Sequence, residues 1–259
     1  MAIRKRNLFQ PGADVPFSLS RSKLDNFLNC PRCFYIDRRL GVSPPNGPPF
    51  NINIAVDLLL KREFDDCRSR GVAHPYMERT GKNLVPFADP RLDAWRENFQ
   101  GVRAVHEDSG FELFGAVDDL WLDKDTGEVI VVDYKATSKE AEINLDADWQ
   151  IAYKRQMDIY QWLLRRNGLT VSSVGYFVYC NGRRDVEHFN GRVEFDVHVL
   201  EYVGDDSWVE GALTDAVECL SKPVVPDPSS HCPQCRYLTD YLNVTTTVGY
   251  ANALDTGQN

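Results

Sequence analysis

Two aspartates in the middle of the chain have the spacing of a cation-dependent hydrolytic site. Asp118 and Asp133 lie on either side of Asp125-Thr126-Gly127, which is typical of a tight hairpin turn. Folding the chain about that turn places the two carboxylates nearly opposite each other, where cross-strand β-carbons are about 4.5–5.5 Å apart. Two carboxylates this close repel each other unless a cation lies between them. The hairpin therefore predicts a site for Mg²⁺ or Mn²⁺, which prefer oxygen ligands.

Lys135 places a positive charge on the same strand face as Asp133, because strand side chains alternate with a period of two. The apolar run 129–132 before them is typical of a buried strand. A divalent cation can polarise a phosphodiester and lower the pKa of a bound water. A lysine can stabilise the negative charge that develops at phosphorus or orient the water. An Asp-x-Lys pair alone, however, is more typical of an exposed surface pair on an edge strand.

Three further features favour the chemical interpretation. Gly115 precedes Asp118 with Gly-x-x-Asp spacing, and a glycine allows close approach to the backbone. Gln156 and Tyr160 are four residues apart and share one face of the helix expected after the hairpin. A half-buried helix face would give the same pair. The third feature is the segment 18–32, with its Ser-x-Ser start and its Cys-Pro-Arg end.

The seven cysteines include two Cys-x-x-Cys pairs, Cys30 with Cys33 and Cys232 with Cys235. An odd count in a chain whose start is not a signal peptide argues against a disulfide framework. Two such pairs can complete a tetrahedral tetrathiolate site, which suits zinc or an iron–sulfur cluster. That site would join the two ends of the chain; alternatively, the pairs never meet. The remaining cysteines are expected in the core: Cys67, Cys180 and Cys219.

The elements expected to position these residues change from helices to strands and back. We expect helices over 20–29, 34–40, 52–70, 92–99, 149–166 and 207–220, and strands over 102–105, 111–122, 129–134, 174–179 and 193–199. Asn181-Gly182 is a hairpin signal. The order predicts a mixed α/β domain over 17–240, preceded by a flexible arm (1–16) and followed by a tail (241–259).

Composition is that of a globular protein, with 43% hydrophobic and 26% charged residues. No stretch approaches the roughly 18 apolar residues of a membrane span. No apolar run follows the basic start of the chain, which argues against a signal peptide and predicts a cytoplasmic location. The net charge of -9 is unusual for a nucleic-acid-binding protein. Carboxylates gathered around cations would contribute to that charge.

The ordered motifs resemble those of the PD-(D/E)xK nuclease superfamily, in particular its RecB-like branch. The motif there is Gly-x-x-Asp, a short hairpin, Asp-x-Lys, and Gln-x-x-x-Tyr on the next helix. The opening Ser-x-Ser … Cys-Pro-Arg-Cys-Phe-Tyr segment is similar to this branch, and the resemblance spans about residues 18–237. It implies a restriction-endonuclease-like core, with a central mixed sheet flanked by helices, and N- and C-terminal helical segments joined by a cysteine site. The matching residues are Gly115, Asp118, Asp133, Lys135, Gln156 and Tyr160.

By this resemblance, Asp118 and Asp133 bind the divalent cation and Lys135 is the catalytic lysine. Gln156 and Tyr160 would position DNA or the lysine. These five residues form the expected catalytic set.

The family usually adds a His or Glu from an upstream helix as a metal ligand. In the helix expected over 52–70, Asp57 is the first candidate and Glu63 the second. Some RecB-like and CRISPR-associated relatives also carry a four-cysteine [4Fe–4S] cluster. Their pattern is one N-terminal and three C-terminal cysteines, whereas this chain has two and two. An iron–sulfur cluster is therefore expected slightly ahead of Zn²⁺ at Cys30, Cys33, Cys232 and Cys235.

The resulting prediction is an Mg²⁺- or Mn²⁺-dependent deoxyribonuclease, an exonuclease acting on single-stranded DNA or DNA ends. One alternative is a nucleic-acid-binding accessory module with the nuclease fold and weak or no catalysis, which the acidic charge and the missing upstream histidine favour. Another is a structural metal protein whose Asp-x-Lys is incidental. DNA repair, CRISPR adaptation and phage metabolism are all compatible with the resemblance, as is a protein partner in a repair or defence complex.

Overall fold

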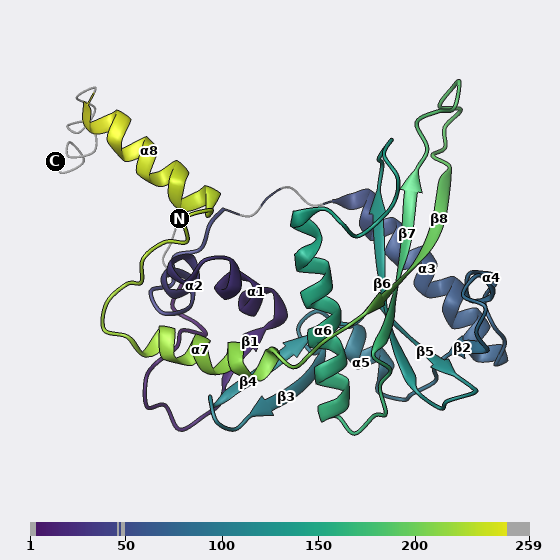
Figure 1. Cartoon of the computed structure of the whole chain (residues 1–259), viewed down its shortest axis with the longest axis horizontal. Helices are drawn as coiled ribbons and strands as arrows, with labels where there is room; N and C mark the ends of the chain where they lie inside the picture. The colour runs from purple at the N-terminus through teal and green to yellow at the C-terminus, as the bar shows by residue number, and fades with distance from the viewer. Residues whose placement is uncertain (1–3, 46, 48–49, 248–259) are drawn as a thin grey trace.

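Two mixed β-sheets with helices around them make up the described part of the chain (Figure 1). The computed structural model describes residues 4–45, 47 and 50–247. The helices are α1 (Arg21–Asn29), α2 (Pro31–Arg38), α3 (Asn51–Arg70), α4 (Pro75–Glu78), α5 (Leu92–Arg96), α6 (Ile151–Arg166, after the 3₁₀ turn Asp148–Gln150), α7 (Val209–Ser221) and α8 (Pro233–Thr247). The strands are β1 (Phe17–Ser20), β2 (Leu84–Pro86), β3 (Val102–His106), β4 (Phe111–Gly115), β5 (Asp119–Asp123), β6 (Val129–Thr137), β7 (Val174–Gly182) and β8 (Phe195–Val203). This architecture confirms the predicted α/β class, a mixed sheet flanked by helices.

The larger sheet has the order β2-β5-β6-β7-β8 and carries the candidate site. β5 and β6 form an antiparallel hairpin, and β6 runs parallel to β7 because α6 connects them. Alternate residues of β6 point to opposite faces of the sheet and pack into two different hydrophobic cores. Val129 and Val131 pack with α6, whereas Ile130 and Val132 pack with α3. The sheet is therefore covered on both faces, which explains the continuous apolar run in β6.

The strand expected over 111–122 is in fact two strands in different sheets. β4 ends at Gly115 and belongs to the smaller sheet, of order β1-β4-β3, whereas β5 begins at Asp119 in the larger one. Between them the backbone N–H of Val117 donates to the carbonyl of Trp95 at 3.1 Å, and the Val117 side chain is fully buried. The apolar pattern continues through the crossover because both sheets share one core, so the pattern alone does not show the break.

The hairpin indicated after strand 174–179 is present, since β7 and β8 pair antiparallel, but its turn does not lie at Asn181-Gly182, because both residues lie within β7 and pair with β8. The loop between these strands spans 183–194. The Asn181 side chain instead accepts from the backbone N–H of Lys139 at 2.8 Å and donates to its carbonyl at 3.0 Å. This asparagine holds the segment that follows β6 rather than a turn.

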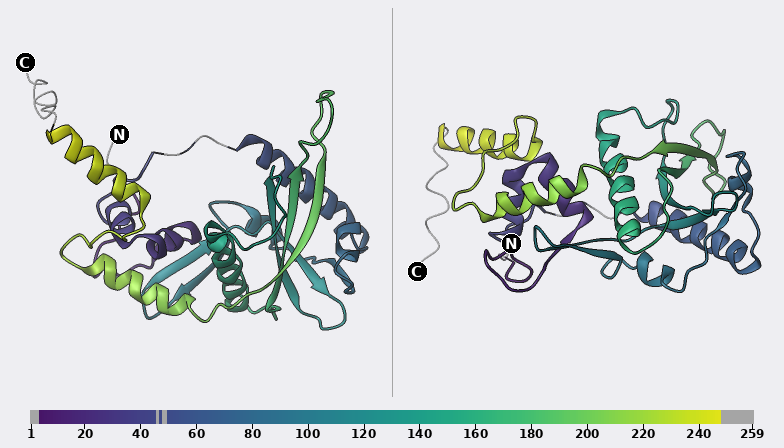
Figure 2. Two further views of the ribbon diagram at one scale, coloured as in Figure 1. Left: turned by 45° about the horizontal axis from the view of Figure 1, so that its top comes forward. Right: turned by 60° about the horizontal axis from the view of Figure 1, so that its bottom comes forward.

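The helices expected over 52–70 and 149–166 are confirmed, and the one expected over 92–99 is shorter because it ends at Arg96. The helix expected over 207–220 begins two residues later, at Val209, with Trp208 at the N-cap. It is not the last helix, since α8 follows it and extends away from both sheets (Figure 2).

The two ends of the chain lie partly outside the described residues. Of the arm expected at 1–16, residues 4–16 are described, and Phe9 packs edge-on against Phe17 and Phe111 at ring distances of 5.5 and 5.9 Å. Of the tail expected at 241–259, residues 241–247 belong to α8 and the rest lie outside the described part. Within the described part, the helices are too short or too polar to cross a membrane.

Gly101 and Gly110 offer a matched test of the packing between β3 and the crossover. Both have a positive φ, of 62° and 65°. A β-carbon at Gly101 would lie 2.6 Å from the carbonyl oxygen of Gly115, whereas one at Gly110 would meet nothing within 4 Å. We expect Gly110→Ala to cost only the left-handed backbone penalty of about 1–2 kcal/mol. Gly101→Ala should cost about 1–3 kcal/mol more, because the backbone must move. Equal losses in urea unfolding would contradict this packing.

Candidate active site

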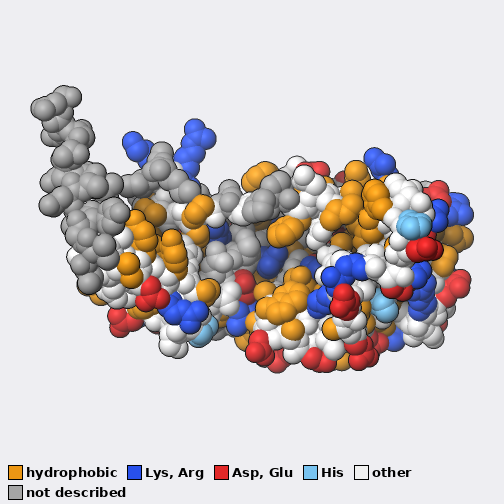
Figure 3. All heavy atoms as spheres, turned by 90° about the horizontal axis from the view of Figure 1, so that it is seen from above, with side chains coloured by type: hydrophobic (Ala, Val, Ile, Leu, Met, Phe, Trp, Pro, Cys, Tyr) orange, Lys and Arg blue, Asp and Glu red, His pale blue; other side chains and the backbone are white. Residues whose placement is uncertain are grey.

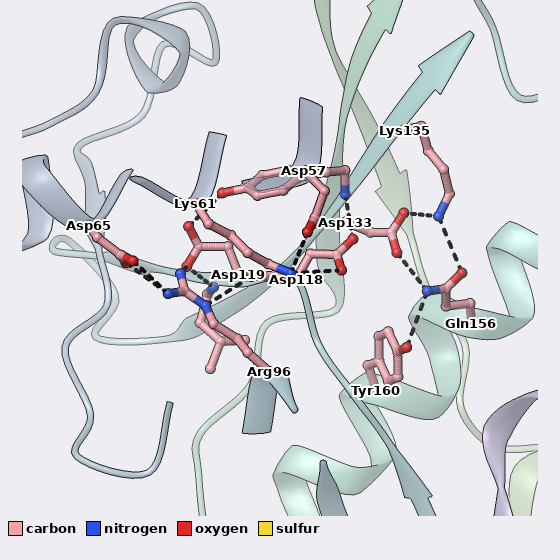
Figure 4. A network of polar contacts seen from close by, with 12 residues as sticks. Asp57, Lys61, Asp65, Arg96, Asp118, Asp119, Asp133, Lys135, Gln156 and Tyr160 are labelled. Carbon is pink, nitrogen blue, oxygen red and sulfur yellow. Dashed lines mark hydrogen bonds and ion pairs between the residues drawn. The ribbon is translucent and has the colours of Figure 1, made fainter. Parts of the chain in front are cut away.

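Asp133 is a fully buried acidic group, with an exposed fraction of 0%. Its Oδ1 accepts a hydrogen bond from Gln156 Nε2 at 2.7 Å, and its Oδ2 contacts the Lys135 ammonium (Figure 4). Burial raises the pKa of the Asp133 carboxyl to about 6 despite the nearby Lys135, and the Asp118 carboxylate adds to the increase. A buried carboxylate beside a second carboxylate is a strong attractor for a cation.

Asp118 lies directly before β5, and the hairpin brings it beside Asp133 as the sequence indicates. Asp119 pairs with Val132 in the ladder, so the next position in register is Asp118 opposite Asp133. The Asp118 Oδ2 accepts from the backbone N–H of Tyr134 at 2.8 Å. This bond fixes one carboxylate oxygen of Asp118, and its Oδ1 faces Lys61 Nζ at 3.8 Å.

Helix α6 supplies the groups that hold Lys135. Lys135 Nζ donates to Gln156 Oε1 at 3.3 Å, and Gln156 Nε2 also lies 3.2 Å from the Tyr160 hydroxyl. A β-carbon at Gly115 would lie 2.6 Å from Cε1 of the Tyr160 ring. The glycine of the Gly-x-x-Asp motif therefore leaves the space that Tyr160 occupies. The structure thus brings together all the motif residues of the sheet and of α6.

Of the two candidate upstream ligands, Asp57 faces the site and Glu63 does not. Asp57 Oδ2 lies 2.9 Å from Lys61 Nζ, which is also the neighbour of Asp118. Burial raises the pKa of Asp57, and the Asp118 carboxylate raises it further. Glu63 instead contacts His74 Nε2 at 3.4 Å. The ammonium of Lys61 thus lies between two carboxylates, at a place where a cation is favoured.

A second buried carboxylate, Asp119, was not anticipated from the sequence. It is fully buried and contacts the guanidinium groups of Arg68 and Arg96, the latter at 2.8 Å. It also accepts from the Tyr134 hydroxyl at 2.6 Å. Arg96 Nε donates to the carbonyl of Asp118 at 3.0 Å. The Asp-Asp doublet at the start of a short apolar strand was the only signal available, and it could not reveal arginines from α3 and α5.

The four cysteines of the two Cys-x-x-Cys pairs meet, as predicted. Cys30 separates α1 from α2, because Pro31 cannot continue the first helix and suits the first position of the second. The sulfur atoms of the four cysteines all lie within 4.8 Å of one another, and those of Cys33 and Cys235 are 3.4 Å apart. Among the described residues, no other cluster of three or more His, Cys, Asp or Glu converges in this way. Such a site could bind zinc or an iron–sulfur cluster.

The thiols of this cluster differ in acidity. Burial alone would raise the pKa of the Cys30 thiol, but hydrogen bonds from the backbone at Cys33 and Ser229 outweigh it and lower the pKa to about 7. Burial raises the pKa of Cys235 to about 11 and that of Cys33 higher still. Four thiolates at this separation repel each other, so a bound cation would stabilise their ionised form.

The fold and this geometry define an α/β protein with a buried carboxylate–lysine site. The chain matches the family model of the PD-(D/E)XK nuclease superfamily over residues 51–239, and it belongs to that superfamily. The match includes Cys232 and Cys235 and begins after Cys30 and Cys33. Among curated proteins the chain has no match. Membership confirms the predicted superfamily and indicates metal-dependent nuclease chemistry with a nucleic acid as substrate.

The raised pKa of Asp133 predicts a pH dependence of stability in metal-free buffer. The folded protein keeps the Asp133 proton up to a pH of about 6, whereas an unfolded aspartate loses it near about 3.9. The folded state therefore binds more protons in this window, and this group's contribution to stability falls as the pH rises through it. Asp133→Asn cannot ionise. Its free energy of unfolding relative to wild type should increase by about 1–3 kcal/mol between pH values of about 4 and about 7. A pH-independent difference in urea unfolding would contradict the assignment.

Proposed function

We propose that this protein is an Mg²⁺- or Mn²⁺-dependent deoxyribonuclease, acting as an exonuclease on single-stranded DNA or DNA ends. The observation that carries the proposal is the fully buried Asp133, which Lys135 and Gln156 contact and which lies beside Asp118 in the hairpin. Superfamily membership supports the nuclease class. The choice of DNA and of exonuclease action follows from the resemblance to RecB-like nucleases.

Asp118 and Asp133 would hold the cation, with Asp57 as a further ligand from α3. The donor set fits a hard divalent ion, because it offers carboxylate oxygens and a place between Asp57 and Asp118 where the Lys61 ammonium now lies. When bound, the ion supplies positive charge to a phosphodiester oxygen and lowers the pKa of a water. Displacement of Lys61 would leave that lysine free to contact a phosphate.

Lys135 would orient the attacking water or stabilise the charge that develops on the phosphoryl oxygens. Its ammonium is held between Asp133 and Gln156, and Tyr160 in turn contacts Gln156. Gln156 and Tyr160 are therefore proposed as positioning residues. Their contacts would restrict the orientation of the lysine, which is a requirement for a group that stabilises charge in the transition state.

A second candidate function is a nucleic-acid-binding module with weak or no catalysis. The observation in its favour is that Lys61 and Lys135 already contact all three carboxylates, so the protein balances these charges with its own side chains. This module would bind DNA, and added divalent ions would change neither its stability nor the DNA.

For the cysteine cluster we propose a [4Fe–4S] cluster, with Zn²⁺ as the alternative. The proposal is supported by the convergence of the four sulfurs and by the resemblance to the RecB-like and CRISPR-associated four-cysteine branch. The cluster would join α2 to α8 and so fix the C-terminal helix. We also infer a cytoplasmic location, which reduced thiols favour, and a protein partner in a repair or defence complex.

Substitution of the site lysine should abolish cleavage. We expect Lys135→Ala and Asp133→Ala to reduce Mg²⁺- or Mn²⁺-dependent degradation of an end-labelled single-stranded DNA by about 10²–10³-fold or more. The control is Lys124→Ala, which removes an exposed lysine from the turn of the same hairpin. Equal cleavage by wild type and the two site variants would contradict the assignment. DNA binding without cleavage by wild type would favour the accessory module.

Iron content should depend on the four cysteines of the cluster and not on the other cysteines of the chain. Protein purified without oxygen should be brown, with visible absorption that bleaches in air, and Cys33→Ser should lose both the colour and the iron. Cys180→Ser should keep them, because Cys180 is buried in β7 outside the cluster. A colourless protein with one zinc per chain would overturn the iron–sulfur proposal. A protein with neither metal would overturn the metal site.

A further inference from the structure

Two adjacent aromatic rings lie between two lysines along a path that leaves the candidate active site. Lys135 Nζ lies 4.4 Å from the ring centre of Tyr153, and the Tyr153 ring contacts the Trp149 ring edge-on at 5.3 Å. Lys139 Nζ lies 5.0 Å from the centre of the Trp149 ring. The path starts at the buried Asp133 and ends at the surface, so it connects the reaction centre with solvent.

Trp149 differs from the other tryptophans of the chain. Its exposed fraction is 53%, whereas Trp95, Trp121 and Trp162 are buried and Trp208 is half-buried. An indole ring exposes a large apolar surface, and here one of its contacts is a lysine ammonium rather than an apolar core. The protein therefore presents a flat aromatic group next to a positive charge, at the outer end of the path.

The segment that carries Trp149 and Lys139 is held in place from both sides. The Asn181 side chain forms two hydrogen bonds with the backbone of Lys139, at 2.8 and 3.0 Å. Gln150, which is fully buried, accepts from the backbone N–H of Ala147 at 3.0 Å and donates to the carbonyl of Asn144 at 2.8 Å. The ring and the ammonium are thus positioned before any ligand binds, which lowers the entropy cost of binding.

The path lies between the end of β6 and the start of α6. In Figure 1, β6 ends and α6 begins at the top of the larger sheet, and Figure 3 shows that face from above. Hydrophobic side chains gather on both sides of a depression in which basic side chains are visible. Hydrophobic and basic side chains are therefore close to one another on the side of the molecule where β6 ends and α6 begins.

We propose that Trp149 and Lys139 form a nucleotide-binding subsite, at which an unpaired base of a single-stranded nucleic acid stacks on the Trp149 ring. The inference deepens the proposed function, on which it rests for the position of the scissile phosphate. Stacking on aromatic side chains is the general means by which proteins bind single strands without reading their sequence. Bases in a duplex are stacked on each other, so this subsite selects unpaired strands.

The charge around the subsite favours base stacking over phosphate contacts. The same segment carries four acidic side chains: Glu140, Glu142, Asp146 and Asp148. Two basic side chains offset part of this charge. Arg184 lies 3.6 Å from Glu140, and the Lys139 ammonium, which contacts Trp149, also lies 5.8 Å from the centre of the Tyr179 ring. A duplex, which depends on many phosphate contacts, would meet repulsion here. A single strand bound mainly by its bases would depend only weakly on salt concentration.

The test measures binding in EDTA, where divalent cations cannot support cleavage. Oligo(dT) and oligo(rU) of about 12 nucleotides are titrated against wild type, Trp149→Ala, Trp149→Phe and Lys139→Ala. We expect both strands to quench tryptophan fluorescence of wild type. Trp149→Ala should weaken binding by about 5- to 100-fold and abolish the quenching, whereas Trp149→Phe should stay within about threefold of wild type. Lys139→Ala should have a smaller effect than Trp149→Ala. If wild type binds oligo(dT) more tightly than oligo(rU), DNA is the preferred ligand, and the reverse order indicates RNA.

Phe99→Ala is the matched control, because it removes an exposed ring from the loop between α5 and β3. It should bind like wild type. If Trp149→Ala binds both strands within twofold of wild type, the subsite is wrong, whether or not the protein cleaves DNA. If Trp149-dependent binding is present but wild type does not cleave with Mg²⁺ or Mn²⁺, the subsite stands and the proposed nuclease function fails.

Discussion

The negative charge of Asp133 has to be balanced inside the protein, because this carboxylate has no contact with solvent. An isolated ionised carboxylate in a protein interior is very unfavourable. Two elements provide the groups that balance it. Lys135 of β6 forms an ion pair with Asp133, and the side-chain amide of Gln156 in α6 donates a hydrogen bond to it. The parallel connection of β6 to β7 through α6 is what brings that helix over the end of β6. The topology of the larger sheet therefore determines which groups balance the charge of Asp133.

A second buried carboxylate, next to Asp118 in the sequence, is also balanced by basic side chains, on the opposite face of the hairpin. Asp119 is also fully buried, and its charge is balanced by Arg68 and Arg96. Tyr134 connects the two centres, because its backbone N–H donates to Asp118 and its hydroxyl to Asp119. The Asp119 carboxylate is paired with two arginines and a tyrosine hydroxyl, and this centre holds the hairpin. The Asp118–Asp133 pair has lysines as its ion-pair partners, and this difference supports the proposal that the pair binds a metal ion.

Local signals in the sequence predicted the parts of the site that lie close together in the chain. The turn at 125–127 fixed the register of the hairpin, and the helical spacing of Gln156 and Tyr160 placed both on one face of α6. The break in the strand expected over 111–122 was not predictable, because the apolar pattern does not show which sheet a residue joins. The position of the turn after β7 was predicted wrongly from Asn181-Gly182 for a related reason, since the role of Asn181 depends on a contact with Lys139.

Contacts between charged groups that are far apart in the chain could not be predicted from the sequence either. Nothing in the spacing of Arg68, Arg96 and Asp119 shows that they meet, and the choice of Asp57 over Glu63 depended on which way each side chain of α3 points. The cysteine pairs were the exception. Two Cys-x-x-Cys motifs far apart in the sequence can together complete a site of four thiolates, and in the structure their sulfurs converge.

The most direct test of the proposed metal site is a calorimetric titration with Mn²⁺ at a pH of about 7, without nucleic acid. We expect wild type to bind the ion, and Asp118→Asn and Asp133→Asn to bind it at least about tenfold more weakly. Asp125→Asn, in the exposed turn of the same hairpin, should bind it like wild type. Equal binding by wild type and the Asp118 and Asp133 variants would contradict a cation held by this pair.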